Sequence, residues 1–396
     1  MPPIYLDNHA TTPVDPRVVA EIVRCMTETF GNASSSEHCY GDNAEAEIKK
    51  AKEQISNLLD CSPREIIFTS GATESLNLAI KGSAAKLLET QNSVSLLISP
   101  LEHKAVIDVC EHLAKTDKRV NLEYLSVDNF GRLNIGEIEN RLGEKRVDLL
   151  AVMAANNEIG NIYPIEEIAK MCSTRETLFV CDATQAVGKI PLSFSEWDID
   201  MLALSAHKIY GPKGVGALLK RKSVKLAPLI HGGQQQHSIR SGTLNVPGIV
   251  GLGWACHYRK LEMENDEDSI SQKRQLLSKL LRDKVEGFRE TGDEINKLAG
   301  NLHFSVLEIP NSAVISRIRD KLAISTGSAC TIGVEEPSHV LQAMGLSSEY
   351  MDGSFRIGVG KFNTDSEIEE AAEILITAIG EVRKFFPVEN SSVSVS

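Results

Sequence analysis

The chain has 396 residues, of which 42% are hydrophobic and 24% are charged, and its formal net charge at pH 7 is −12. This length suggests about two domains and is sufficient to bury a large hydrophobic core. The composition is ordinary for a globular protein. The acidic balance argues against nucleic-acid binding as the main role, so we expect no direct nucleic-acid partner.

No apolar run approaches the roughly 18 residues that a membrane span requires. Residues 1–7 lack the basic and apolar regions of a secretory signal. The eight cysteines include no Cys-x-x-Cys pair, which argues against a disulfide framework and against a zinc site. We therefore expect a cytoplasmic protein with no membrane association and no bound metal.

Short apolar runs alternate with helix-like segments between residues 66 and 222. The runs are too short and too β-branched for long helices, and several are apolar on both faces, as in parallel strands covered by helices. They occupy residues 66–70, 94–99, 120–125, 147–154, 178–182, 201–205 and 214–219. The sequence predicts an α/β fold with a mostly parallel sheet flanked by helices, and ligands at the carboxyl ends of its strands.

The C-terminal third has a different pattern. A charged stretch at 260–270 leads into an amphipathic segment at 271–287, which we interpret as the exit from the large domain into a long helix. Strands at 301–306 and 354–359 and a final helix at 367–386, opened by a capping box at 364–367, indicate a smaller α+β domain. The predicted organisation is a large domain at 13–260, a small domain built from 1–12 and 261–388, and a flexible tail at 389–396.

Two strands end in residues with complementary chemistry. Asp182 ends one apolar run, and Lys208 closely follows another. Pyridoxal phosphate (PLP) requires both groups, because a lysine amine forms an imine with its aldehyde and a carboxylate keeps its pyridine nitrogen protonated. Each residue alone is an ordinary strand end. The pair, with Gln185, Ser205 and His207 beside it, favours a PLP site.

A phosphate cradle is predicted at residues 69–74, where a strand, a tight turn and a helix start follow one another. Free backbone N–H groups and the helix dipole would meet the phosphate there, although a plain turn capped by Thr73 fits equally well. Ser205 and His207 offer further donors, and residues 240–243 offer a hydroxyl and a cation. Glycine patterns of dinucleotide or Walker sites are absent from the sequence, so a dehydrogenase has less support.

Two more polar residues follow strand ends. His103 is suited to stacking on the cofactor ring or to proton transfer. Asn157 could reach the ring hydroxyl or a substrate carboxylate. For Lys208, a nearby cation and partial burial would lower the amine pKa and keep the amine nucleophilic.

Several segments together resemble cysteine desulfurases, a branch of the class-V aminotransferases among the fold-type I PLP enzymes. The resemblance extends from about residue 3 to 380 and is carried by residues 5–13, 69–74, 205–208, 240–245 and 325–330. It implies a catalytic cysteine on a mobile loop, which takes sulfur from L-cysteine, releases L-alanine and becomes a persulfide. Cys330 matches that nucleophile, since a thiolate is the soft nucleophile that sulfur transfer requires. A buried core cysteine is the alternative, which the Ser/Gly-rich setting disfavours.

The resemblance also implies residue roles. His103, Lys208 and Cys330 would be catalytic, with His103 stacked on the ring. The substrate carboxylate would be held by Asn157 and Arg356, for which a planar guanidinium is suited. Cofactor contacts would come from Ala72, Thr73, His103, Asn157, Asp182, Gln185, Ser205, His207 and Lys208, with Thr243 reaching in from the second subunit of a homodimer.

The sequence departs from the family pattern in places. Lys361 stands where arginine is common, and residues 234–236 and Cys39 also differ from the usual motifs. The alternatives left open are a selenocysteine lyase or other class-V enzyme, and a non-catalytic PLP-binding scaffold of a sulfur-transfer complex. The sulfur acceptor protein also stays open, with iron–sulfur cluster assembly and tRNA or DNA sulfur modification as candidate pathways.

Overall fold

The computed structural model describes residues 2–326, 330–331, 334–335 and 337–385, without the side chains of 330–331 and 334–335. Its largest sheet has seven strands in the order β2-β8-β7-β6-β5-β3-β4. All are parallel except β8, which is antiparallel to both neighbours. The bounds are β2 Ile66–Thr69, β3 Val94–Ile98, β4 Val120–Tyr124, β5 Leu149–Ala151, β6 Leu178–Asp182, β7 Met201–Ser205 and β8 Gly216–Lys220. The predicted α/β class and mostly parallel sheet are confirmed.

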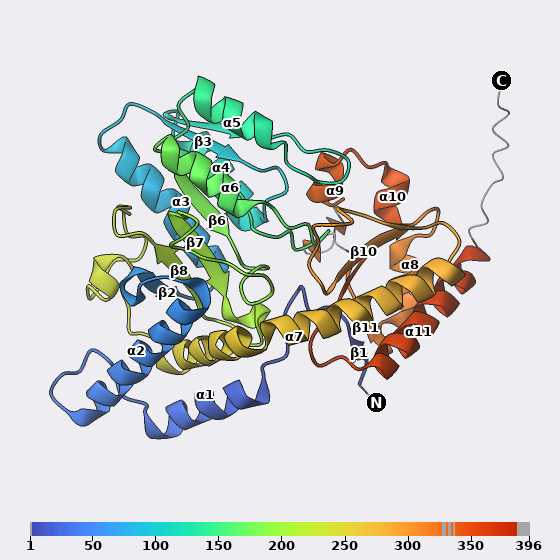
Figure 1. Cartoon of the computed structure of the whole chain (residues 1–396), viewed down its shortest axis with the longest axis horizontal. Helices are drawn as coiled ribbons and strands as arrows, with labels where there is room; N and C mark the ends of the chain where they lie inside the picture. Colours follow the sequence, from blue (N-terminus) through green and yellow to red (C-terminus); the bar gives the residue numbers. More distant parts are fainter. Residues whose placement is uncertain (1, 327–329, 332–333, 336, 386–396) are drawn as a thin grey trace.

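Helices cover both faces of this sheet, which explains why its strands are apolar on both sides (Figure 1). Alternate strand residues enter different cores: Leu96 and Val180 pack with one helix layer, whereas Leu97 and Cys181 pack with the other. The first layer contains α3 (Ala72–Leu88) and α4 (Lys104–Thr116). The second contains α2 (Cys39–Leu59), α5 (Ile135–Glu144), α6 (Ile165–Thr174) and the first half of α7 (Val246–Lys284).

A separate apolar core surrounds an antiparallel sheet of order β14-β10-β9. Its strands are β9 (Phe288–Glu290), β10 (Asn301–Val306) and β14 (Ser354–Gly358). The rings of Phe304 and Phe355 stack across β10 and β14, with centroids 5.2 Å apart. The N-terminus joins this core, because β1 (Ile4–Tyr5) pairs with β11 (Leu322–Ala323) and Leu6 is fully buried there.

The remaining helices, strands and turns of the described chain complete the fold. The helix α11 (Asp365–Arg383) begins at the predicted capping box of Thr364 and Glu367, which is therefore confirmed. The others are α1 Pro16–Glu28, α8 Asn311–Ile318, α9 His339–Ala343, α10 Ser348–Asp352, β12 Cys330–Thr331, β13 Val334–Glu335, and the 3-10 turns η1 Pro63–Glu65, η2 Ala206–Lys208 and η3 Gln236–Ser238. None of the described helices combines the length and apolar character needed to cross a bilayer. The predicted tail at 389–396 lies outside the described residues.

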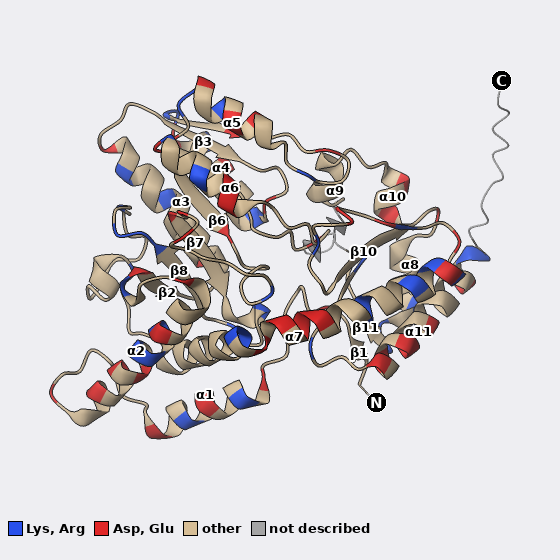
Figure 2. Cartoon of the chain, viewed as in Figure 1, with Lys and Arg blue, Asp and Glu red and all other residues tan. Residues whose placement is uncertain are grey.

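The helix α7 differs from the sequence expectation. It is one continuous helix of 39 residues that starts at Val246, so the predicted boundary at 260/261 falls inside it. Figure 1 shows α7 running from the lobe of the large sheet to α11, and Figure 2 shows acidic residues gathered at its middle. These acids have partners: Arg259, 1% exposed, pairs with Asp266 and Glu267. The charged stretch is therefore the ion-paired middle of a helix.

The short helix α9 packs against the core of the large sheet. Its apolar residues Val340 and Leu341, with Met344 just after it, belong to the same cluster as Leu150 and Phe179. This segment follows the one that carries Cys330, and sequence analysis had placed it in the small domain. The contact brings the start of α9 to the strand ends of the large sheet.

Candidate active site

A cavity of about 960 Å³ lies at the carboxyl ends of the parallel strands. One wall comes from residues after β2, β3, β5, β6 and β7. The opposite wall comes from the N-terminal segment, β14 and α9. The predicted site residues that line the cavity are Ala72, Thr73, His103, Asn157, Asp182, Gln185, Ser205, His207, Lys208 and Arg356.

Two predicted residues are not placed in this cavity. Thr243 is exposed and is not part of the lining of its own chain's cavity. Cys330 begins β12, which pairs with β13, but its side chain lies outside the described part of the chain.

Lys208 is held at the cavity wall by two short hydrogen bonds. Its Nζ donates to the backbone oxygens of His9 and Ala10, at 2.6 and 2.7 Å. Burial, followed by the positive charges of Lys189 and Arg356, lowers the pKa of the Lys208 amine to about 7. An amine with this pKa is substantially neutral at physiological pH, so it can attack an aldehyde.

The predicted phosphate-binding end is the N-terminus of α3. This helix begins at Ala72 after Gly71, and no described side chain caps it, so the predicted alternative of a Thr73 cap is wrong. Its first N–H groups and the positive end of the helix dipole therefore remain available to an anion. Ser205 and His207 line the same end of the cavity. Burial lowers the pKa of His207 to about 4, which leaves a neutral hydrogen-bonding ring.

Asp182 ends β6, Gln185 follows it, and both line the cavity. Asp182 is 6% exposed, and its Oδ1 accepts a hydrogen bond from the Thr184 N–H at 2.9 Å. Gln185 is oriented by donating from Nε2 to the His9 oxygen, at 2.8 Å, and its Oε1 accepts from Lys189 Nζ, at 2.9 Å. A buried carboxylate at this position is suited to hold a protonated ring nitrogen.

His103 caps α4 through its own ring. Its Nδ1 accepts a hydrogen bond from the Ala105 N–H at 3.1 Å, which places the proton of the neutral ring on Nε2. Burial lowers the pKa of His103, Asp182 opposes this effect, and Lys208 and His339 lower the pKa further. The ring is therefore neutral, and it offers an N–H group.

Arg356 reaches the cavity from β14 on the opposite wall. Its Nη2 pairs with Asp7 Oδ1 at 3.0 Å, and its Nη1 donates to the Asn157 oxygen at 3.2 Å. The Nε atom is buried and has no hydrogen-bond partner among the described residues. A guanidinium with donor capacity left over in a buried site is suited to bind a small carboxylate.

Six titratable residues that line the cavity had no predicted role: His9, Glu74, Lys104, Glu158, Lys213 and His339. Burial raises the pKa of Glu158 to about 7, and a hydrogen bond from Ser338 opposes that effect. His9 and Glu158 lie inside motifs that sequence analysis had identified, next to Asn8 and Asn157. Their position beside those residues was the signal that could have identified them as site residues. His339 had no local signal, because it reaches the cavity only through the packing of α9.

The residues present fit PLP on structural grounds. The uncapped start of α3 suits a phosphate, the buried Asp182 suits a pyridinium nitrogen, and Lys208 supplies an amine with a pKa near neutrality. These three features occur along one cavity, whose volume is in the range of small-molecule sites.

The structure shows the contacts or positions of three residues at which the sequence departs from the family pattern. Lys361 makes an ion pair through Nζ with Asp15 Oδ2 at 2.6 Å, so lysine retains a pair at that position. Gln236 forms two hydrogen bonds with the backbone of Phe68, at the edge of the large sheet. Cys39 is exposed at the start of α2 and is not part of the cavity lining.

Comparisons with known proteins agree with this geometry. Residues 4–370 match the family aminotransferase class-V. The chain is 39% identical over 388 residues to the cysteine desulfurase IscS of Rickettsia felis, which covers 98% of this chain and 93% of that protein. A NifS-like protein structure has a TM-score of 0.86 at 34% identity, covering 97% of this chain and 100% of the other. The structure of SspA in complex with cysteine has a TM-score of 0.79 at 32% identity, covering 91% and 99%. The chain belongs to the class-V aminotransferase family, and cysteine desulfurases are among its relatives over nearly its whole length.

Proposed function

We propose that this protein is a PLP-dependent cysteine desulfurase, which converts L-cysteine to L-alanine and forms a persulfide on Cys330. The observation that carries this proposal is the convergence of Lys208, Asp182 and Arg356 on one cavity. A non-catalytic scaffold would have no chemical need for all three groups. The relatives named cysteine desulfurase and the relative solved with cysteine support L-cysteine as the substrate.

Each wall of the cavity has a distinct task in this reaction. PLP, when bound, supplies an electron sink for the bonds around the substrate's α-carbon. Asp182 would hold the proton of the ring nitrogen, and Lys208 would hold the cofactor through Nζ. A free Lys208 amine can also accept and return a proton, because its pKa is about 7. Arg356 orients the substrate through its carboxylate.

The sulfur step balances without an external oxidant. A thiol of the enzyme loses its proton and attacks the substrate sulfur, and a sulfur–sulfur bond forms. The bond between the β-carbon and sulfur breaks, its electron pair stays on the β-carbon, and that carbon gains one proton to become the methyl group of alanine. We assign the attacking thiol to Cys330 from the family resemblance. An acceptor protein would then reduce the persulfide by thiol exchange.

We also propose a homodimer. The helix α1 exposes an apolar row at helical spacing, formed by Val19, Val23 and Met26, and Phe30 follows it. These four side chains are 43 to 62% exposed, and the exposed Tyr40 packs against Phe30 with ring centroids 5.4 Å apart. A patch of this kind is typical of a protein interface. A second subunit would also supply Thr243, which does not line its own chain's cavity.

Two further expectations remain part of the proposal. The two apolar clusters on the faces of the large sheet and the separate cluster around the small sheet are consistent with a large domain at 13–260 and a small domain formed by 1–12 and 261–388, joined by α7. A cytoplasmic location accords with the free thiols of the seven cysteines at 25, 39, 61, 110, 172, 181 and 256. The identity of the acceptor protein, and hence the pathway, is not part of the proposal.

The direct test compares parent protein with Cys330→Ser and with the matched control Cys39→Ser. Alanine and sulfide are measured from L-cysteine and dithiothreitol. We expect equal amounts of both products from the parent and from Cys39→Ser, and neither product from Cys330→Ser, which should still bind PLP. A parent that binds PLP but forms no alanine would contradict the proposed function, and full activity in Cys330→Ser would contradict the assigned nucleophile.

A further inference from the structure

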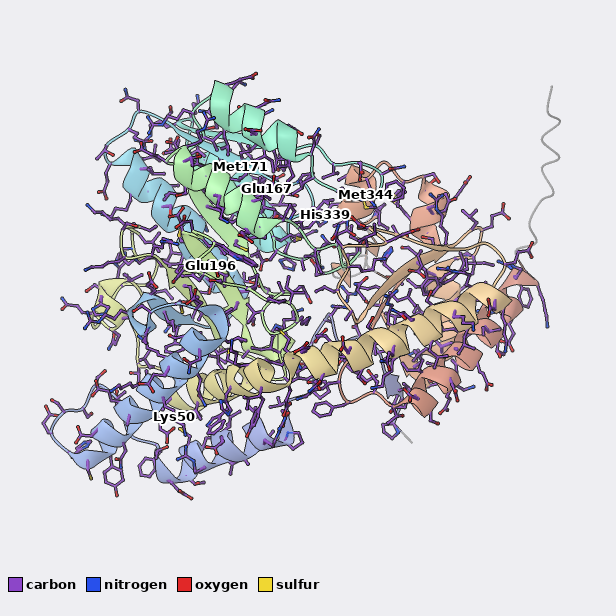
Figure 3. The ribbon with its side chains drawn as sticks, in the orientation of Figure 1. Lys50, Glu167, Met171, Glu196, His339 and Met344 are labelled. Atoms are coloured by element: carbon purple, nitrogen blue, oxygen red, sulfur yellow. The ribbon has the colours of Figure 1, made fainter. Side chains whose placement is uncertain are left out.

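The cavity contains an imidazole to which sequence analysis gave no role. His339 is the first residue of α9 and lines the cavity opposite the strand ends. Figure 3 shows it between α9 and the loops of the large domain, with Met344 farther along the same segment. It is only partly buried, so solvent and small molecules can reach it.

The proton position on His339 follows from its one hydrogen bond. Its Nε2 lies 2.9 Å from the backbone oxygen of Glu102. A carbonyl oxygen only accepts hydrogen bonds, so Nε2 must donate and carries a proton. The neutral ring therefore has its lone pair on Nδ1. No described residue bonds Nδ1, and His339 is a partly buried residue of the cavity lining.

His103 presents the opposite chemistry. Its Nδ1 lone pair is occupied by the Ala105 N–H, and the proton is on Nε2. To take up a proton, His103 would have to give up the hydrogen bond that caps α4. It is therefore arranged as an N–H donor, whereas His339 is arranged as a base.

The other titratable candidates lack an accessible lone pair in the right place. His9 donates from Nδ1 to Gln185 Oε1 at 3.2 Å, and its free Nε2 is fully buried. The free Oε1 of Glu158 is fully buried as well. His207 engages Thr11 Oγ1 through Nδ1, at 3.1 Å, and follows β7 on the wall that carries Lys208. Among the imidazoles of the described cavity lining, His339 is the one that comes from α9, and its hydrogen bond to the Glu102 oxygen leaves the lone pair on Nδ1.

We propose that His339 is the proton acceptor of the sulfur-transfer step. This inference rests on the proposed function and adds a catalytic group to it. Nδ1 takes the proton that the attacking thiol gives up, and the same proton goes to the substrate's β-carbon after the carbon–sulfur bond breaks. One proton is removed and one is delivered, so His339 returns to its neutral form in each cycle. General acid–base groups of this kind contribute about 10²- to 10⁴-fold to the rate.

His339 shares the cavity with charged and titratable groups from every wall: His9, Glu74, His103, Lys104, Glu158, Asp182, His207, Lys208, Lys213 and Arg356. Burial lowers the pKa of His103, and the charges of Lys208 and His339 lower it further, although Asp182 opposes the effect.

His339→Gln is the decisive variant because the glutamine amide can still donate to the Glu102 oxygen but offers no basic nitrogen. His112→Gln, on the exposed face of α4, is the matched control. We expect His339→Gln to bind PLP and L-cysteine within about threefold of the parent, judged by absorbance titration. Its rate of alanine formation should fall about 10²-fold at pH 7. The deficit should shrink towards pH 9.5, where a thiol with a pKa of about 8.5 ionises without help.

A second variant and a measurement free of activity complete the test. His339→Ala should regain part of its rate with added imidazole, which a purely structural role would not allow. Nitrogen-15 NMR of histidine-labelled protein should show His339 protonated on Nε2 and unprotonated on Nδ1.

Three results would overturn the proposal: a rate within about threefold of the parent at every pH, an equal loss at every pH together with lost substrate binding, or an Nδ1–H form in the spectrum. Failure of the proposed function would be seen separately, as a parent protein that forms no alanine, and would remove the role of His339 with it.

Discussion

The two walls of the cavity are built in different ways. The wall of the large sheet consists of residues at the ends of parallel strands, so sheet geometry alone brings Asp182 and Lys208 to one edge. The opposite wall depends on contacts between distant parts of the chain. Arg356, for example, pairs with Asp7, 349 residues away. The first wall is therefore a local property of the strands, and the second is a property of the whole fold.

Removing the amine of the first wall should have the largest effect. Lys208→Ala loses the group that holds the cofactor and moves protons, so we expect alanine formation to fall by about 10⁴-fold or more. The absorbance of the lysine-bound cofactor should disappear as well. Lys222→Ala, at an exposed lysine after β8, is the control and should match the parent. Turnover near the parental rate in Lys208→Ala would refute the assignment of the first wall.

Asp182→Asn removes the negative charge of the Asp182 carboxylate, on the same wall, with little change in the shape of the side chain. The amide oxygen can still accept from the Thr184 N–H, but it no longer stabilises a protonated ring nitrogen. We expect kcat to fall about 10²- to 10³-fold, comparable to the loss of one preorganised electrostatic contact, with a small change in KM. Steady-state kinetics and the absorbance of the bound cofactor measure both effects. An unchanged kcat would mean that the ring nitrogen does not lie against Asp182.

Arg356→Lys tests the opposite wall. A lysine keeps the positive charge but loses the planar fork, so we expect KM for L-cysteine to rise about 10- to 100-fold, corresponding to one charged hydrogen bond. Cysteamine, which lacks the carboxylate, should bind parent and variant equally. Arg289→Lys, at a surface arginine that contacts Tyr350, is the control. Equal weakening for L-cysteine and cysteamine would show that Arg356 supports the structure of the wall rather than the substrate.

The same difference explains what the sequence could predict. The strands of the large sheet and the residues that follow them were predicted within a few positions, because periodicity and strand-end rules are local. The continuity of α7 was missed because its charged middle resembles a linker in the sequence. Its acidic residues form ion pairs with Arg17, Arg259 and Lys361, and these pairs become visible only in the folded structure. His339 was missed because only the packing of Val340 and Leu341 against the large core carries it to the cavity.

An ion pair beside the opposite wall, between the segment after β14 and the start of α1, gives the smallest expected effect and the sharpest dependence on pH. Lys361, after β14, pairs with Asp15, before α1, and both side chains are at most 7% exposed. Burial raises the pKa of Asp15, but hydrogen bonds from Arg17 and Lys361 outweigh it, so the net pKa is well below its usual range. A carboxyl with a depressed pKa stabilises the fold above its unfolded pKa of about 3.9, and this stabilisation is lost as the pH falls towards the folded value.

Lys361→Met should therefore reduce the free energy of unfolding by about 1–3 kcal/mol at pH 7, since Asp15 keeps Arg17 as a partner. The difference from the parent should narrow as the pH falls below about 4, where Asp15 of the variant becomes protonated. Lys361→Arg should restore the pair and stay close to the parent. Urea unfolding at several pH values measures the effect. A constant difference down to pH 3 would mean that Lys361 acts by packing on Tyr210 and Phe362, whose rings it also contacts, rather than through its ion pair with Asp15.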